Sequence, residues 1–63
     1  MYFILFKSPA NNQWYWNLRA ANNEKIAASE GYIAKQSALD TIRAVKAAAA
    51  GASIYDDSEK NWV

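Results

Sequence analysis

The fold is decided by the stretch Gln13-Trp14-Tyr15-Trp16-Asn17-Leu18-Arg19-Ala20. Apolar residues alternate along it with polar or amphipathic ones, which is the period of a β-strand with one buried face. The apolar parity carries Trp14, Trp16, Leu18 and Ala20, and the opposite parity carries Gln13, Tyr15, Asn17 and Arg19. Because two tryptophans share a parity with a leucine, the pattern predicts that the first of these faces packs in the core.

The composition favours association with a second copy. A chain of 63 residues forms one domain and buries only roughly 60 % of the surface that it exposes when unfolded. The absence of cysteine and histidine excludes disulfides and thiolate or imidazole zinc sites. Aromatic residues make up 14 % of the chain, and their large apolar areas need cover. We therefore expect a homodimer that uses neither metal nor cofactor.

Charge and hydropathy point away from membranes and from dedicated nucleic-acid binders. The formal net charge is only +1, which gives no basic footprint. No apolar run approaches the roughly 20 residues of a membrane-spanning helix. The short apolar run at residues 2–6 has neither a basic flank before it nor a cleavage site after it. We expect a cytoplasmic protein.

Turn residues on both sides of the central stretch predict a three-stranded antiparallel meander. Residues 2–6 are aromatic or branched and suit a first strand, and residues 8–12 contain the proline and asparagines of a turn. Asn22 and Asn23 tolerate the left-handed backbone of a second tight turn before a third strand at residues 25–29. Both parities of the first strand are apolar, so the second face of the sheet is unusually apolar.

The apolar period changes to that of a helix from about residue 35. One stripe carries Ala38, Leu39, Ile42, Val45 and Ala49. The helix begins either near Lys35 or at Ala38 with Ser37 as its cap, and Gly51 suits a left-handed position after its end. Residues 52–55 predict a fourth short strand. The fold class is therefore α+β, with one unit at residues 1–56 and a polar tail at 57–63, in which Trp62 and Val63 have the chemistry to dock on a surface.

Several stretches together resemble one known family. They are Trp16-Asn17-Leu18-Arg19-Ala20-Ala21-Asn22, Ile26-Ala27-Ala28-Ser29-Glu30-Gly31-Tyr32 and Ile42-Arg43-Ala44-Val45-Lys46. In this order and spacing they are similar to the YegP-like family of small bacterial and archaeal proteins of unknown function. The resemblance implies a β-β-β-α-β unit that occurs as a tandem repeat or a homodimer, with one continuous sheet and exchanged C-terminal strands. For this single unit it implies a homodimer whose Ser53, Ile54 and Tyr55 pair in the partner.

The chain departs from the family pattern at three positions. Asn23 stands where a glycine is usual, Ala34 where a serine commonly caps the helix, and Ile4 where an acidic residue is frequent. Loss of a capping serine costs about 1 kcal/mol, and Ser37 is the nearest replacement. The isoleucine makes the second sheet face more apolar than the family pattern.

The second sheet face is the candidate binding surface. It carries Tyr2, Ile4, Phe6, Tyr15, Asn17 and Arg19. Aromatic and basic sheet faces bind single-stranded nucleic acid by stacking, which is one interpretation. The alternative is that a protein partner covers the face, and we favour it because the basic residues are too few to follow a phosphate backbone.

Two other clusters have a structural interpretation beside a chemical one. In Ser29-Glu30-Gly31-Tyr32 a serine or glutamate could act as nucleophile or base, but there is no histidine to activate it. A structural role is favoured, with Gly31 supplying an unusual backbone angle. Asp56, Asp57 and Glu59 lack the glycine and the terminal glutamate of a calcium loop, so a solvated acidic segment is favoured over a metal site.

The sequence thus predicts a small homodimeric interaction module without enzymatic activity, which binds a macromolecular partner through the exposed sheet face. Weak binding of single-stranded nucleic acid by Tyr15, Asn17 and Arg19 is the alternative. A small-molecule enzyme has the least support, because no catalytic constellation is present.

Overall fold

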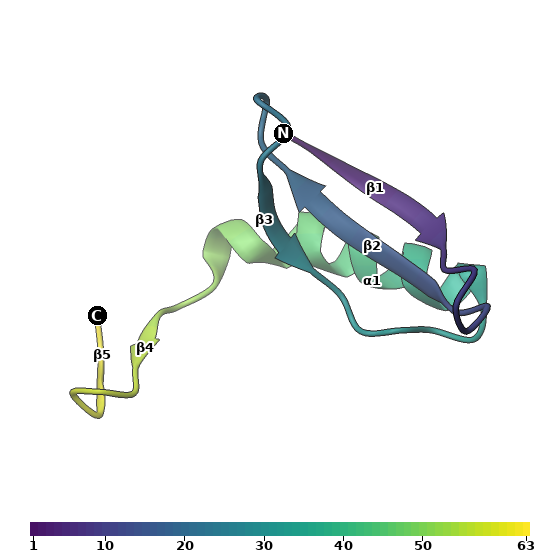
Figure 1. Ribbon diagram of the computed structural model, residues 1–63. Coiled ribbons are helices and arrows are strands. Elements are labelled where there is room, and N and C mark those ends of the chain that lie inside the picture. Colours follow the sequence, from purple (N-terminus) through teal and green to yellow (C-terminus); the bar gives the residue numbers. More distant parts are fainter.

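The computed structural model describes residues 1–63 and shows a three-stranded antiparallel sheet with one helix on one face (Figure 1). The elements are β1 (Tyr2–Lys7), β2 (Trp14–Arg19), β3 (Lys25–Ala28), α1 (Lys35–Ala48), the 3₁₀ turn η1 (Ala49–Gly51), β4 (Tyr55–Asp56) and β5 (Asn61–Trp62). The predicted α+β class, the meander, the single helix and a C-terminal strand are confirmed. An additional strand, β5, pairs with β4.

The register of the central hairpin places the predicted core parity under the helix. Phe3 lies opposite Leu18, and Leu5 lies opposite Trp16. The Phe3 and Trp16 rings meet edge to face, with centroids 5.4 Å apart. Aromatic pairs in this geometry contribute about 1 kcal/mol beyond the area that they bury.

The core is small. Only Trp16, Ala38 and Ile42 are buried, and Ala38 is fully inaccessible. A side chain as small as that of Ala38 allows the helix to approach the sheet closely, and Ile42 follows one turn later on the same face. Half-buried apolar residues surround these three: Phe3, Leu5, Trp14, Leu18, Ala27, Tyr32 and Val45.

Asparagines close both turns of the meander in the left-handed conformation, as predicted. The φ angles are 58° at Asn12 and 68° at Asn23. The backbone N–H of Asn12 donates to the carbonyl of Ser8 at 2.8 Å. Asparagine is one of the few residues that occupies this region at low cost, so neither turn needs a glycine.

The start of the helix matches one of the two predicted alternatives, whereas its end differs from the prediction. The helix begins at Lys35, with Ala34 as a cap residue whose side chain makes no hydrogen bond. Ser37 is therefore already inside the helix, where its carbonyl accepts a hydrogen bond from the Thr41 hydroxyl at 3.0 Å, and its predicted capping role is wrong. The predicted left-handed Gly51 is also wrong, because its φ is not positive. The helix ends in η1 instead, and a 3₁₀ turn satisfies terminal carbonyls without a left-handed residue.

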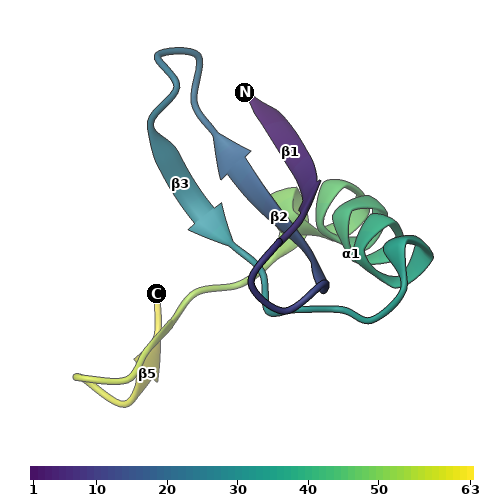
Figure 2. The same ribbon diagram turned by 45° about the vertical axis from the view of Figure 1, so that its right-hand side comes forward.

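The helix covers only part of the sheet. α1 packs on β1 and β2, and β3 lies outside this contact. Beyond the sheet, the chain continues through η1 to β4 and β5, which stand apart from the rest of the protein in both views (Figures 1 and 2). The structure therefore consists of a helix-on-sheet body and a separate C-terminal hairpin.

Replacing Ile42 tests how far stability depends on the helix-sheet contact. We expect Ile42→Ala to lower the free energy of unfolding by about 2 kcal/mol, because it leaves a cavity between α1 and Trp16. The matched control is Ile33→Ala, at a position that is 88 % exposed. It should change the free energy by less than about 0.5 kcal/mol in urea unfolding. Equal effects of the two variants would contradict this description of the core.

Candidate functional site

The structure brings the six predicted surface residues together on the sheet face opposite α1. In the β1–β2 register, Tyr2 lies opposite Arg19, Ile4 opposite Asn17, and Phe6 opposite Tyr15. We call these six residues the outer face. Tyr2 and Phe6 are exposed and the other four are half-buried. The geometry therefore provides a continuous mixed surface of aromatic, aliphatic and polar side chains on β1 and β2.

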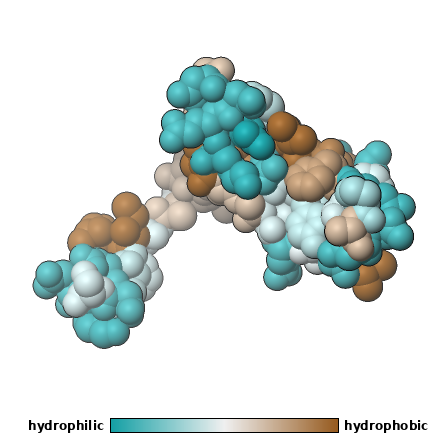
Figure 3. All heavy atoms as spheres, in the orientation of Figure 1, coloured by the Kyte–Doolittle hydropathy of each residue, from teal (hydrophilic) through white to brown (hydrophobic).

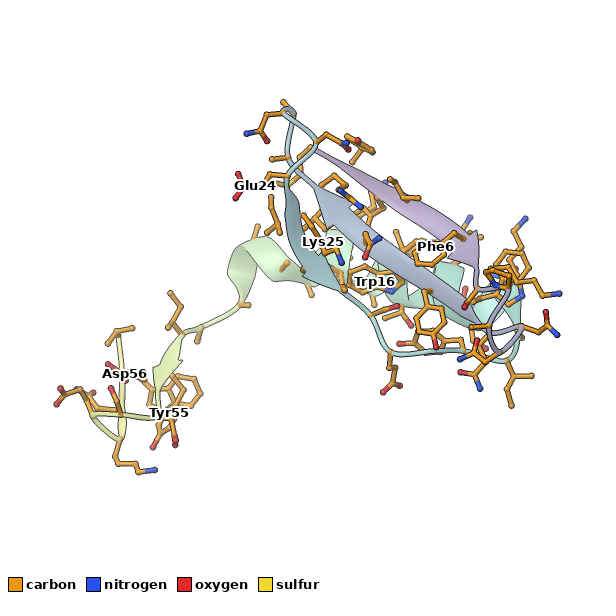
Figure 4. All side chains as sticks on the ribbon, viewed as in Figure 1. Phe6, Trp16, Glu24, Lys25, Tyr55 and Asp56 are labelled. Atoms are coloured by element: carbon orange, nitrogen blue, oxygen red, sulfur yellow. The ribbon has the colours of Figure 1, made fainter.

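One end of the outer face is a fixed aromatic pair. The Phe6 and Tyr15 rings stack with centroids 5.8 Å apart and an interplanar angle of 19°. The Asn11 side-chain amide donates to the Tyr15 hydroxyl at 2.7 Å, which holds the tyrosine over this end of the sheet. Phe6 is labelled in Figure 4, near the end of β1. Because the two rings cover each other, less of their surface is free to stack on a third ring.

The other end of the outer face is tied to the turn between β2 and β3. The Tyr2 hydroxyl donates to Asn23 Oδ1 at 2.6 Å, and Arg19 Nη1 donates to the Asn23 carbonyl at 3.0 Å. Arg19 is the only cation among the six residues, and part of its guanidinium is engaged within the chain. Binding of single-stranded nucleic acid by this face stays a prediction, and one engaged cation supports it weakly.

Residues 29–32 extend the sheet edge rather than form a reactive group. The backbone N–H of Trp16 donates to the Ser29 hydroxyl at 2.9 Å, and that hydroxyl donates to the Glu30 carbonyl at 2.8 Å. Trp14 and Tyr32 exchange two backbone hydrogen bonds, of 2.6 and 2.8 Å. The Ser29 hydroxyl is therefore used in holding this segment on β2, which agrees with the structural interpretation.

Gly31 is required for space and not for its backbone angle. Its φ is not positive, so the predicted unusual angle is wrong. A β-carbon at this position would lie 2.8 Å from the Tyr15 hydroxyl oxygen and would also meet the Gln13 side chain. The glycine lets the segment pass directly beneath Tyr15. Sequence patterns did not show this, because the two residues are distant in the chain.

A groove that the sequence did not predict runs between β1 and α1. It has a volume of about 700 Å³. Its lining is apolar except for one lysine, and includes Met1, Phe3, Leu5, Leu39, Val45 and Lys46. We call it the β1–α1 groove. β1 contributes residues of its core parity to the groove, and it is an edge strand, so no further strand lies beside it there.

The C-terminal hairpin is held by an aromatic pair and a carboxylate. The Tyr55 and Trp62 rings pack edge to face at 5.1 Å. Asp56 Oδ1 accepts hydrogen bonds from the Ser58 hydroxyl at 2.5 Å, the Ser58 N–H at 3.0 Å and the Glu59 N–H at 3.3 Å. The hydrogen bond from the Ser58 hydroxyl and the backbone bonds hold the pKa of Asp56 below its usual 3.8. The residues predicted as a polar tail, 57–63, thus contain a structured turn and a strand.

The predicted exchange strand lies at the start of this hairpin. Ser53 and Ile54 precede β4, and Tyr55 is its first residue. Ile54 is 64 % exposed, and Trp62 and Val63 are 65 % and 74 % exposed. Hydrophobic atoms gather on the hairpin, at the lower left of Figure 3, away from the body of the protein. Apolar side chains in this position have no cover from the rest of the chain.

The acidic residues of the turn do not assemble as metal ligands. No group of three or more aspartate or glutamate side chains comes together in the structure. The one ion pair of the chain joins Lys60 Nζ to Asp57 Oδ1 at 2.9 Å.

The helix α1 is neither long enough nor apolar enough to cross a membrane.

Comparison with known proteins identifies the family. The family model described as a domain of unknown function, DUF1508, matches residues 10–56. A UPF0339 protein of Neisseria meningitidis serogroup B is 43 % identical over 51 residues, covering 76 % of this chain and 89 % of the relative. A UPF0339 protein of Neisseria meningitidis serogroup A / serotype 4A matches with the same identity and coverage.

The match includes β2, β3, α1 and β4, which together form most of the fold. The chain belongs to the DUF1508 family of proteins of unknown function. The resemblance to the YegP-like family is thereby supported at the level of family. Residues 57–63, including β5, lie beyond the family match.

A methyl group at residue 31 tests the contact beneath Tyr15. We expect Gly31→Ala to displace Tyr15 from the Phe6 ring and to lower the free energy of unfolding by about 1 kcal/mol, since overpacking forces side chains out of their rotamers. Ring proton shifts of Tyr15 in NMR spectra report the displacement. The control is Gly51→Ala, where an added β-carbon meets nothing within 4 Å. Unchanged Tyr15 shifts in Gly31→Ala would contradict the close approach.

The lowered pKa of Asp56 predicts an acid-sensitive hairpin. Because the folded pKa lies below 3.8, the charged form stabilises the hairpin at neutral pH, and this contribution disappears as the pH falls through the folded pKa. We expect the Trp62 ring-current shifts on Tyr55 to collapse in that range. Asp56→Asn should show weakened shifts already at pH 7, whereas the control Asp57→Asn should behave as wild type. A hairpin signal at pH 7 that Asp56→Asn leaves unchanged would refute the role of Asp56.

Proposed function

We propose that this protein is a homodimeric interaction module without enzymatic activity, and that the dimer presents the outer face to a macromolecular partner. The observation that carries this proposal is the unfilled β1–α1 groove beside the unpaired edge of β1. Apolar surface of this extent on a small chain is typical of an interface.

The thin core supports association. Three buried residues are few for an independent domain, and the chain has neither a disulfide nor a histidine or cysteine to bind a metal. A second copy would cover the edge of β1 and the groove together. Pairing of residues 53–55 with the partner, as the family resemblance implies, would add the backbone hydrogen bonds that the edge lacks.

The outer face suits a partner other than a second copy. Its ends are held by the Phe6–Tyr15 stack and by the bonds of Tyr2 and Arg19 to Asn23, so its shape is largely set before binding. Preformed aromatic surfaces bind with little loss of side-chain entropy. Tyrosine and arginine are also the residues that most often dominate protein interfaces.

Sedimentation equilibrium of the wild-type protein tests the dimer. We expect a two-fold mass at micromolar concentration, because the exposed groove and the edge of β1 are both unfavourable in water. Circular dichroism on the same samples shows whether the chain is folded. A stable, folded monomer at these concentrations would remove the proposed dimer.

Photo-crosslinking in cells tests the outer face separately. A photoreactive amino acid at Asn17, in the middle of this face, should give a discrete product heavier than the crosslinked dimer. The same amino acid at the exposed Gln36 on α1 is the control and should not give this product. Products limited to the dimer from position 17 would contradict the binding role of the face.

A further inference from the structure

The C-terminal hairpin keeps a defined shape although its large apolar side chains are exposed. Trp62 packs edge to face on Tyr55, yet 65 % of it is accessible. The Val63 N–H donates to the Ile54 carbonyl at 3.0 Å. This bond joins the two strands at the open end of the hairpin, next to the aromatic pair. The hairpin makes no contact with the sheet or with α1. The hairpin therefore presents an apolar surface of defined shape that no other part of the chain covers.

The β1–α1 groove has the size and the apolar lining to hold a tryptophan side chain. It is open, its volume of about 700 Å³ exceeds that of an indole side chain, and its walls are apolar. Leu39 and Val45 line it from the helix, and Leu5 lines it from β1. Energetic hot spots of interfaces are enriched in tryptophan and lie in well-packed, desolvated pockets.

The charges of the two surfaces are complementary. Lys46 is the only charged residue of the groove, and the chain's single ion pair does not involve it. The hairpin turn carries Asp56, Asp57 and Glu59 against one cation, Lys60. Opposite charges at the rim of an apolar contact orient the partners and suppress wrong registers.

We propose that Trp62 of one copy occupies the β1–α1 groove of a second copy, with the acidic turn of the hairpin beside Lys46. This inference rests on the proposed dimer and adds an anchor that lies beyond the family match. Each copy carries one hairpin and one groove, so two such contacts form around a two-fold axis and the assembly closes as a dimer. The preformed hairpin lowers the entropy lost on docking.

Intermolecular NMR contacts in a mixed dimer test the proposal directly. One copy is uniformly ¹³C-labelled, so that the filter removes the signals of its own Trp62, and the other copy is unlabelled. We expect isotope-filtered NOEs between the Trp62 indole protons of the unlabelled copy and the Leu39 and Val45 methyl groups of the labelled copy. Absence of these intermolecular NOEs from a sample that is dimeric would overturn the proposal.

Substitution gives an independent test. Trp62→Ala should raise the dissociation constant of the dimer at least about tenfold, whereas the exposed control Ile33→Ala should leave it unchanged within about twofold. Lys46→Glu should weaken the dimer, and adding Glu59→Lys in the same chain should restore it in part, because the contact between these two residues then has both charges reversed while Asp56 and Asp57 keep theirs. All four positions are exposed and lie outside the helix-sheet core, so each variant should keep the helix signal of the wild-type circular dichroism spectrum.

The outcomes separate this proposal from the proposed function. A folded wild-type monomer would refute the dimer itself. A wild-type dimer whose dissociation constant does not respond to Trp62→Ala would leave the dimer standing and refute Trp62 as its anchor. A dimer weakened by Lys46→Glu but not rescued by Glu59→Lys would refute the pairing of the acidic turn with Lys46.

Discussion

The structure depends on the close contact of one helix with one strand, where Ala38 and Ile42 of α1 meet Trp16 of β2. A two-layer domain is stable only if the apolar stripe of the helix and the apolar face of the sheet cover each other. Here the helix is 14 residues long and lies on β1 and β2 alone, so the covered area is small. The small side chain of Ala38 brings the layers together, and the large ring of Trp16 fills the space that remains.

A thin core leaves apolar surface uncovered elsewhere on the protein. The groove beside β1, the aromatic pair on the outer face and the hairpin around Trp62 lie in three different places. Scattered apolar residues on a surface need no explanation, but concave or preformed apolar clusters are typical of interfaces.

Much of the fold followed from local patterns, and the errors share one cause. The alternation of Trp14, Trp16 and Leu18 predicted the core face, and the structure confirms that these residues pack in or against the core. The alternative cap at Ser37, the left-handed Gly51 and the unusual backbone angle of Gly31 were wrong. Each was inferred from local backbone chemistry, whereas tertiary contacts decide the conformation there. Strand parity predicted which residues share the outer face. It did not predict the hydrogen bonds that these residues form with Asn11 and Asn23.

The sequence by itself determined the periods, the turns and the parity of each strand, because these depend on neighbours within a few positions in the chain. Only the tertiary structure decided where β1 meets α1, how closely Gly31 passes beneath Tyr15, and that the hairpin of Tyr55 and Trp62 stands away from the body. These features arise where residues distant in the chain pack or fail to pack, and whether they pack depends on volume and orientation. Hydropathy patterns along the chain contain neither quantity.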